Sequence, residues 1–169
     1  MGCAGAKYNI FKTLTFVLIF FLNQTLANKV EILNVAPNLI FVVVLCASLV
    51  ENSSSNIYYS FGFGLLFDFF NSKIMCIYAI TFVVIPFVLS EIYHTYFENM
   101  ISVKTVFAII GCFAYSFLFA VFFGLRGVDF FAVLIKVSVV EFVYNSLLAV
   151  VVLFLYKRIV NVRKSAWRV

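Results

Sequence analysis

The chain alternates between long apolar runs and short polar joints. Six runs are long enough to form helices, at about residues 9–27, 33–50, 56–70, 75–93, 104–123 and 130–156. A helix needs about 20 residues to cross the hydrocarbon core of a bilayer, although about 17 can suffice. The pattern therefore predicts an all-α, polytopic integral membrane protein with six transmembrane helices in a single domain, residues 1–169. The third run is short, so we expect its helix to be packed among its neighbours.

Composition narrows the possible functions. Of the 169 residues, 65% are hydrophobic and only 11% are charged, whereas about a quarter of the residues in a soluble domain are charged. So few charged side chains cannot cover a water-soluble globule, which excludes a soluble enzyme. The four cysteines are scattered and form no pair with metal-ligand spacing. Paired carboxylates and nucleophile motifs are also missing from the sequence, so we expect no enzymatic activity, no cofactor and no metal.

Basic residues indicate the topology. Five of the 12 Lys and Arg residues lie in the tail 157–169, namely Lys157, Arg158, Arg163, Lys164 and Arg168. Such a tail is typical of a cytoplasmic end, where anionic lipid headgroups attract it. Six helices would place both termini on that side. No folded basic surface is available for phosphate contacts, so nucleic-acid binding is not expected. The first run also resembles a cleavable signal peptide, but the even number of helices favours its retention.

A stripe of small and acidic residues runs along the third predicted helix. Ser60, Gly64 and Asp68 recur every four residues, so they share one helix face. Small residues at this spacing let a neighbouring backbone approach closely, which is how helices associate in lipid. We interpret the stripe as a helix-packing or partner seam, with Asp68 accepting hydrogen bonds from the Asn71–Lys73 turn or from a partner. The alternative is that Asp68 only faces the outer headgroups.

Polar residues also interrupt the last apolar run. Ser138, Glu141 and Asn145 share one face of the predicted helix, and Glu141 lies about 16 Å along it, near the bilayer centre. An ionisable residue at this depth is costly unless it faces the bundle interior or a cavity. We favour a buried carboxyl that hydrogen-bonds through Ser138 or Asn145. A transport or substrate site is the alternative.

Three segments carry motifs: Ala36-Pro37-Asn38-Leu39-Ile40, the stretch from Ser60 to Asp68, and Val139 to Arg158. In this order they resemble the MreD family of bacterial rod shape-determining membrane proteins. The opening of the second helix, with Pro37 and Asn38, is similar to the Pro-Asn start of the same helix in that family. Ser60, Phe61, Gly64 and Asp68 match its Gly-Phe-x-x-Gly-x-x-x-Asp stretch, with Ser60 in place of the usual Gly. The last helix and basic tail of the family resemble Val139 to Arg158, including Asn145 and the exit Leu155-Tyr156-Lys157-Arg158. The resemblance extends over almost the whole chain.

This resemblance implies a non-enzymatic scaffold of the cell-elongation complex in the bacterial cytoplasmic (inner) membrane. Its implied partner is MreC, a single-helix coiled-coil membrane protein. Through MreC it would reach the actin-like MreB, the glycosyltransferase RodA and the elongation transpeptidase, and so help to control cell shape and lateral peptidoglycan synthesis. The family fold is similar to the substrate-binding subunits of energy-coupling-factor transporters. A vitamin-like small-molecule-binding subunit is therefore the alternative function.

These two functions predict different surfaces. A small-molecule-binding subunit requires a polar, aromatic-lined cavity near the outer face. A scaffold instead requires an exposed small-residue or aromatic surface for another membrane helix. The arrangement of the side chains on the folded helices therefore discriminates between them.

Overall fold

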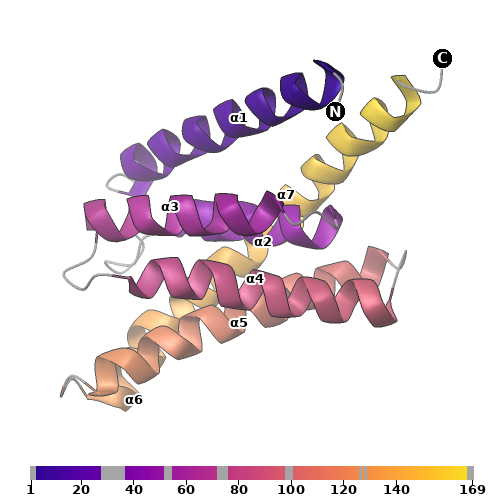
Figure 1. Cartoon of the computed structure of the whole chain (residues 1–169). Helices are drawn as coiled ribbons and strands as arrows, with labels where there is room; N and C mark the ends of the chain where they lie inside the picture. Colours follow the sequence, from indigo (N-terminus) through magenta and orange to yellow (C-terminus); the bar gives the residue numbers. More distant parts are fainter. Residues whose placement is uncertain are drawn as a thin grey trace.

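The computed structural model describes residues 3–27, 37–51, 55–71, 76–97, 101–125, 127 and 129–166, and these residues contain helices but no strand. The helices are α1 (Cys3–Ala27), α2 (Leu39–Val50), α3 (Ser55–Asn71), α4 (Ile77–Tyr96), α5 (Ile101–Leu125), α6 (Phe130–Val133), the π-helical turn η1 (Leu134–Ser138) and α7 (Val139–Ala166). Because α6, η1 and α7 follow one another without a break, they form one rod. The described residues therefore form six rods (Figure 1).

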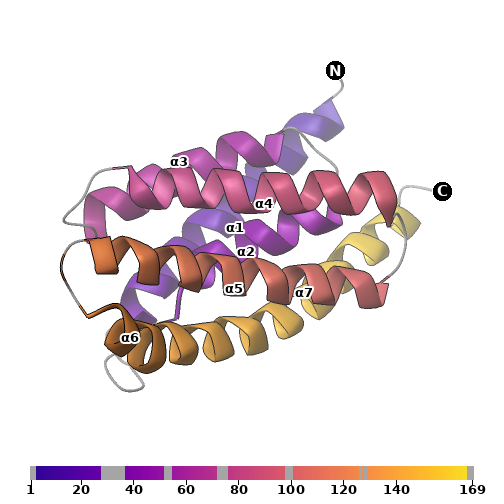
Figure 2. The ribbon, with the colours of Figure 1, turned by 90° about the horizontal axis from the view of Figure 1, so that it is seen from below.

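The rods pack around α2. This helix contacts α1, α3, α4, α5 and α7, and α3 and α4 lie side by side (Figure 1 and Figure 2). The first turns of α1 and the last turns of α7 extend from the same end of the bundle (Figure 1). Two terminal helices that emerge together are expected from an even number of rods.

The second helix differs most from the sequence prediction. It begins at Leu39 rather than near residue 33, because residues 37 and 38 are not helical; residues 33–36 lie outside the described part of the chain. Its 12 residues span only about 18 Å, and the ten residues 40–49 are all buried. A helix that is hydrophobic all round is a buried helix.

The fully enclosed short helix is therefore α2, while the third helix is packed among its neighbours on one side, against α4 and α2. One face of α3 is exposed, with Tyr58 79% exposed and Phe69 81% exposed. The last helix also departs from the prediction, because it continues past Tyr156 to Ala166. Residues 157–166 contain no Gly or Pro, and basic side chains near a helix C-terminus interact favourably with its dipole.

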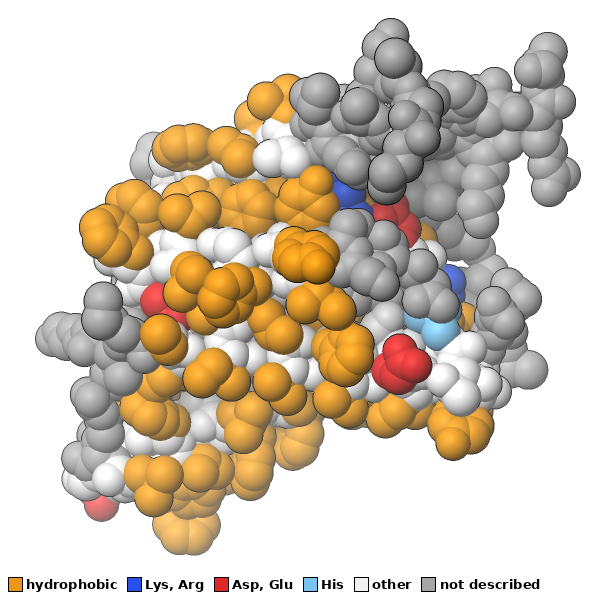
Figure 3. Space-filling model, viewed as in Figure 1, with side chains coloured by type: hydrophobic (Ala, Val, Ile, Leu, Met, Phe, Trp, Pro, Cys, Tyr) orange, Lys and Arg blue, Asp and Glu red, His pale blue; other side chains and the backbone are white. Residues whose placement is uncertain are grey.

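Three helical segments in the described part of the chain are long and apolar enough to cross a membrane: Ile77–Tyr96, Ser102–Leu125 and Leu134–Tyr156. Hydrophobic side chains spread over the visible face of the molecule, and the visible charged side chains lie mostly towards its two ends (Figure 3). Such a surface suits lipid.

Aromatic rings fill the space between α2, α4 and α5. Phe41 stacks on Tyr115 with ring centroids 4.3 Å apart, and Phe119 lies 4.8 Å from both Tyr115 and Tyr78. Phe82 contacts Phe41 with the centroids 5.5 Å apart. Ring contacts at these separations add stabilisation beyond simple burial, so this column fixes α2 against α4 and α5.

Candidate functional site

The predicted stripe on α3 faces α4, and we call this contact the α3–α4 seam. Ser60, Gly64 and Asp68 are all buried. A Cβ atom at Gly64 would lie only 2.6 Å from the Ala79 Cα atom and 3.1 Å from the Tyr78 carbonyl oxygen. Both atoms belong to the backbone and cannot rotate away. The α4 backbone therefore approaches closely because residue 64 has no side chain, as in other helix contacts within lipid.

Asp68 closes the seam by capping α4. Its Oδ1 atom accepts a hydrogen bond from the Tyr78 N–H at 3.1 Å, and its Oδ2 atom accepts one from the Ala79 N–H at 2.8 Å. Cys76, the residue before the helix, has φ 74° and forms no side-chain capping bond. Asp68 therefore satisfies from a neighbouring helix the amides that a local capping residue usually satisfies. Of the turn proposed at Asn71–Lys73, residues 72 and 73 lie outside the described residues.

The other two motif residues of α3 have different surroundings. The Ser60 hydroxyl donates to the Asn56 carbonyl oxygen one turn earlier, at 2.7 Å. Phe61 lies at the side of the stripe and is 52% exposed. The stripe is thus internal to this chain, while Phe61 faces its surroundings.

A second polar cluster surrounds the buried start of α2, and we call it the Asn38 network. The Asn38 side chain accepts from the Phe41 N–H at 3.1 Å and donates through Nδ2 to the Tyr115 hydroxyl at 2.8 Å. The Asn38 N–H donates to Asn145 Oδ1 at 3.1 Å, and the N–H of Leu39 donates to Asn23 Oδ1 at 2.8 Å. The first amides of a helix have no partner within it. Asparagine side chains supply those partners here, where water cannot.

Pro37 comes directly before this network and is buried. Proline has no N–H group, so it adds no donor that the buried end of α2 would have to satisfy. The Pro-Asn pair thus suits a buried helix start, because Pro37 has no N–H group to satisfy and Asn38 caps the helix.

Glu141 belongs to the same network but has a different partner from the one expected. Its carboxyl lies close to the Tyr115 hydroxyl of α5, and within the described residues it makes no hydrogen bond with Ser138 or Asn145. Ser138 and Asn145 are fully buried, whereas Glu141 is partly exposed. Among the residues that the structure describes, no Lys or Arg forms an ion pair with Glu141. The Asn145 Nδ2 atom is buried and has no hydrogen-bond partner.

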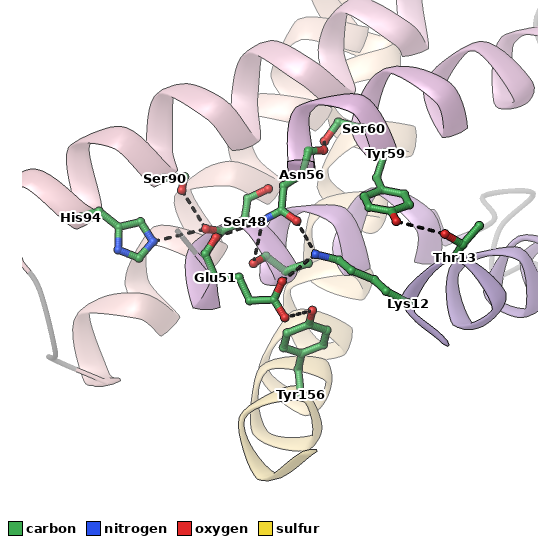
Figure 4. Close-up of polar contacts among 11 residues, drawn as sticks. Lys12, Thr13, Ser48, Glu51, Asn56, Tyr59, Ser60, Ser90, His94 and Tyr156 are labelled. Carbon is green, nitrogen blue, oxygen red and sulfur yellow. Dashed lines mark hydrogen bonds and ion pairs between the residues drawn. The ribbon is translucent and has the colours of Figure 1, made fainter. Parts of the chain in front are cut away.

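A third cluster joins four rods at the end of the bundle where both terminal helices emerge (Figure 4). The Lys12 ammonium forms an ion pair with Glu51 Oε2 at 2.6 Å and donates to Asn56 Oδ1 at 2.6 Å. The other carboxylate oxygen of Glu51 accepts from the Tyr156 hydroxyl at 2.8 Å. Lys12 also lies 5.4 Å from the centre of the Tyr59 ring. We call these residues the Lys12–Glu51 cluster.

The same end of the bundle satisfies the last carbonyl groups of α2. The Ser48 carbonyl oxygen accepts from the Ser90 hydroxyl at 2.7 Å and lies 3.4 Å from His94 Nε2 (Figure 4). Asn56 Nδ2 donates to the carbonyl oxygens of Ala47 and Glu51. Both ends of the buried α2 helix are therefore capped by side chains from its neighbours.

The sequence analysis did not predict the Lys12–Glu51 cluster or the partners of Asn38. A signal for Lys12 was present, because it lies four and eight residues before Phe16 and Phe20 and so shares their helix face. Within the described residues, no group of three or more His, Cys, Asp and Glu side chains could hold a metal ion. The polar side chains of all three clusters mainly bind other parts of the chain.

A family comparison agrees with the resemblance found in the sequence. The model of the rod shape-determining protein MreD matches residues 5–160. This chain belongs to the MreD family. The match spans all three clusters, from Lys12 to Tyr156. A search of curated proteins and a search of solved structures give no match.

Membership implies involvement in the complex that determines rod shape. MreD proteins form a shape-determining structural membrane protein family that is not known to be enzymatic.

Proposed function

We propose that this MreD protein is a non-enzymatic scaffold of the cell-elongation complex that binds MreC. Through MreC it connects to MreB, RodA and the elongation transpeptidase, and it helps to control cell shape and lateral peptidoglycan synthesis. Family membership supports this role. The hydrogen bonding supports it too, because the polar side chains hold helices together rather than form a catalytic set. A scaffold needs a fixed shape, and these contacts provide one.

We further propose that the chain crosses the cytoplasmic membrane six times, with both termini in the cytoplasm. The emergence of α1 and α7 from the same end of the bundle supports this topology (Figure 1). The basic residues after Tyr156 support the orientation, and they would meet anionic headgroups there. Reporter fusions at Val169 and Lys73 test it. A cytoplasmic signal at Val169 and an external signal at Lys73 are expected, and an external signal at Val169 would overturn the topology.

The outward face of α3 is the surface that we propose for MreC. It carries Tyr58, Phe61, Gly62 and Phe69, all of them exposed. A Cβ atom at Gly62 would meet no other atom within 4 Å, so a helix could approach this position as closely as α4 approaches Gly64. Exposed aromatic rings around a small residue are the surface expected of a scaffold, and this observation carries the proposal.

Recovery of MreC tests the scaffold function. Gly62→Leu adds bulk to the outward face at a position where a Cβ atom meets no neighbouring helix, so it should leave the protein level in the membrane unchanged and reduce co-purified MreC strongly. Val106→Phe is the matched control, because it adds bulk to a residue of α5 that is 52% exposed. Undiminished recovery with Gly62→Leu would exclude this face, and rod-shaped growth without the protein would exclude the cellular role.

The Asn38 network favours one alternative function, the binding of a vitamin-like small molecule. The unpaired Asn145 Nδ2 atom and the Glu141 carboxyl could each bind a polar group. If so, the protein purified from membranes would carry a ligand detectable by mass spectrometry, and Asn145→Leu would lose it. Ligand-free wild-type protein that still recovers MreC would favour the scaffold.

A further inference from the structure

Helix α1 attaches to the bundle through a narrow stripe. In residues 12–25 the buried side chains are Lys12, Phe16, Phe20 and Asn23, spaced by four, four and three residues. Most of their neighbours face outward, with Leu14 66% exposed, although Ile19 and Gln24 are half-buried. The stripe is thus one residue wide, whereas α2 is buried on all sides.

The apolar middle of this stripe provides little preference for the docked position. Phe16 stacks on Tyr59 and on Phe63, with centroids 5.5 and 5.4 Å apart, and Phe20 lies 5.6 Å from Phe70. In water, burial of these rings would hold α1 firmly. In a bilayer the rings meet lipid tails when they leave α3, so the hydrophobic drive is absent. Packing contacts then favour docking, together with one hydrogen bond between the Thr13 and Tyr59 hydroxyls, 3.0 Å apart.

The polar ends of the stripe are different. At one end the side chain of Lys12 is 4% exposed and contacts Glu51 and Asn56. At the other end Asn23 accepts from the N–H of Leu39. These groups are buried in the docked bundle, and separation of α1 would break their bonds, which is costly for buried charges and polar groups. The ion pair carries the largest of these costs.

Glu51 connects both terminal helices. One carboxylate oxygen binds Lys12 of α1 and the other binds Tyr156 of α7 (Figure 4). A change in the Lys12 contact therefore alters the charge that Tyr156 faces, at the point where α7 leaves the bundle.

We propose that α1 is a strap that docks on α2 and α3 and separates from them as a unit within the membrane, and that the Lys12–Glu51 ion pair is its lock. When the lock is closed, α1 covers the face of α3 formed by Tyr59 and Phe63 and touches Phe70 at its edge. When the lock opens, this face becomes available and Glu51 retains Tyr156. The strap is independent of the proposed contact with MreC, which lies on a different face of α3.

Distances between spin labels in lipid nanodiscs test the strap. Leu18 on α1 and Val84 on α4 are 61% and 48% exposed, so labels on cysteines at these positions should not disturb packing, once the native cysteines are replaced by Ala. The otherwise unmodified protein should give one narrow distance. Lys12→Met should add a longer distance. It should shift the equilibrium from docked towards separated α1 by about 100-fold or more, the usual consequence of leaving a buried charge unpaired. Methionine keeps a contact with the Tyr59 ring.

A double variant that changes both members of the ion pair is the decisive control. Lys12→Met with Glu51→Gln removes both charges, so this double variant should return towards the single narrow distance. Lys12→Arg should remain docked, and Lys136→Met, which removes an exposed lysine, should have no effect. A second label pair, Val84 with Leu118 of α5, should give the same distance in every variant.

Two results would overturn the strap. The first is an unchanged distance between α1 and α4 in Lys12→Met. The second is a change in both the Leu18–Val84 and the Val84–Leu118 distances in Lys12→Met. This would mean that the whole bundle loosens and that α1 does not move as a unit.

Discussion

The two faces of α3 carry similar residues but have opposite surroundings. On the inward face, Gly64 meets the α4 backbone so closely that a Cβ atom would clash with Ala79. On the outward face, Gly62 meets nothing within 4 Å. In lipid both faces can be apolar, so polarity does not distinguish them. The difference shows that a small residue in a membrane helix has a structural role only when a second backbone approaches it.

The largest effect should come from Gly64→Leu. Its side chain would overlap the Ala79 backbone and push α4 away, and overpacking of this kind costs about 3 kcal/mol or occasionally more. Thermal unfolding in detergent should show a clear fall in Tm for Gly64→Leu and none for Gly62→Leu. Equal Tm values for the two variants would contradict the difference in packing between the two faces.

Asp68→Ala should have the next largest effect. It removes two hydrogen bonds from the first turn of α4 and leaves buried amides without partners, at a cost of about 2 kcal/mol. Asp68→Asn should cost less, because an amide oxygen can still accept. Asp129→Ala is the control, since Asp129 is exposed and makes no side-chain capping bond. Thermal unfolding in detergent measures the stability of all three variants. An equal loss of stability in Asp68→Ala and Asp129→Ala would contradict the capping role of Asp68.

These two inward variants should also weaken recovery of MreC and round up rod-shaped cells. The cause would be indirect, because Gly64 and Asp68 are buried within this chain. Their effect should therefore follow the loss of folded protein, whereas the effect of Gly62→Leu should appear at a normal protein level. Recovery compared at matched membrane levels separates the two causes.

A smaller effect is expected from Glu141→Gln. The amide can take the place of a protonated carboxyl beside the Tyr115 hydroxyl, so the loss of stability should be below about 1 kcal/mol. Cell shape and membrane level should stay close to those of the unmodified protein. If the variant inserted and folded but lost function, the charge of Glu141 would have a role of its own.

The smallest effect should be that of Gly62→Ala. Alanine favours a helix over glycine by about 1 kcal/mol, and Gly62 has space for a Cβ atom. The variant should therefore unfold at the same temperature or slightly higher. A fall in Tm would show that the outward face already has a packing partner.

Much of the fold could be predicted from the sequence, because helix formation in lipid depends on local apolar runs. The four-residue spacing of Ser60, Gly64 and Asp68 also placed them correctly on one face. The neighbour that meets this face could not be predicted, since it depends on how α4 packs. The short α2 was also missed, because its start is set by Asn38 with Asn145, which lies 107 residues away. Contacts at such separations leave no periodic signal in the chain.

Photo-crosslinking in living cells tests the proposed MreC surface most directly. A benzophenone amino acid at Phe61, on the outward face of α3, should form an adduct with MreC. The same amino acid at Phe117, which is 43% exposed on α5, should form none. An adduct at position 61 alone is the result that this account predicts. No adduct at position 61 in protein of normal level, or equal adducts at both positions, would contradict it.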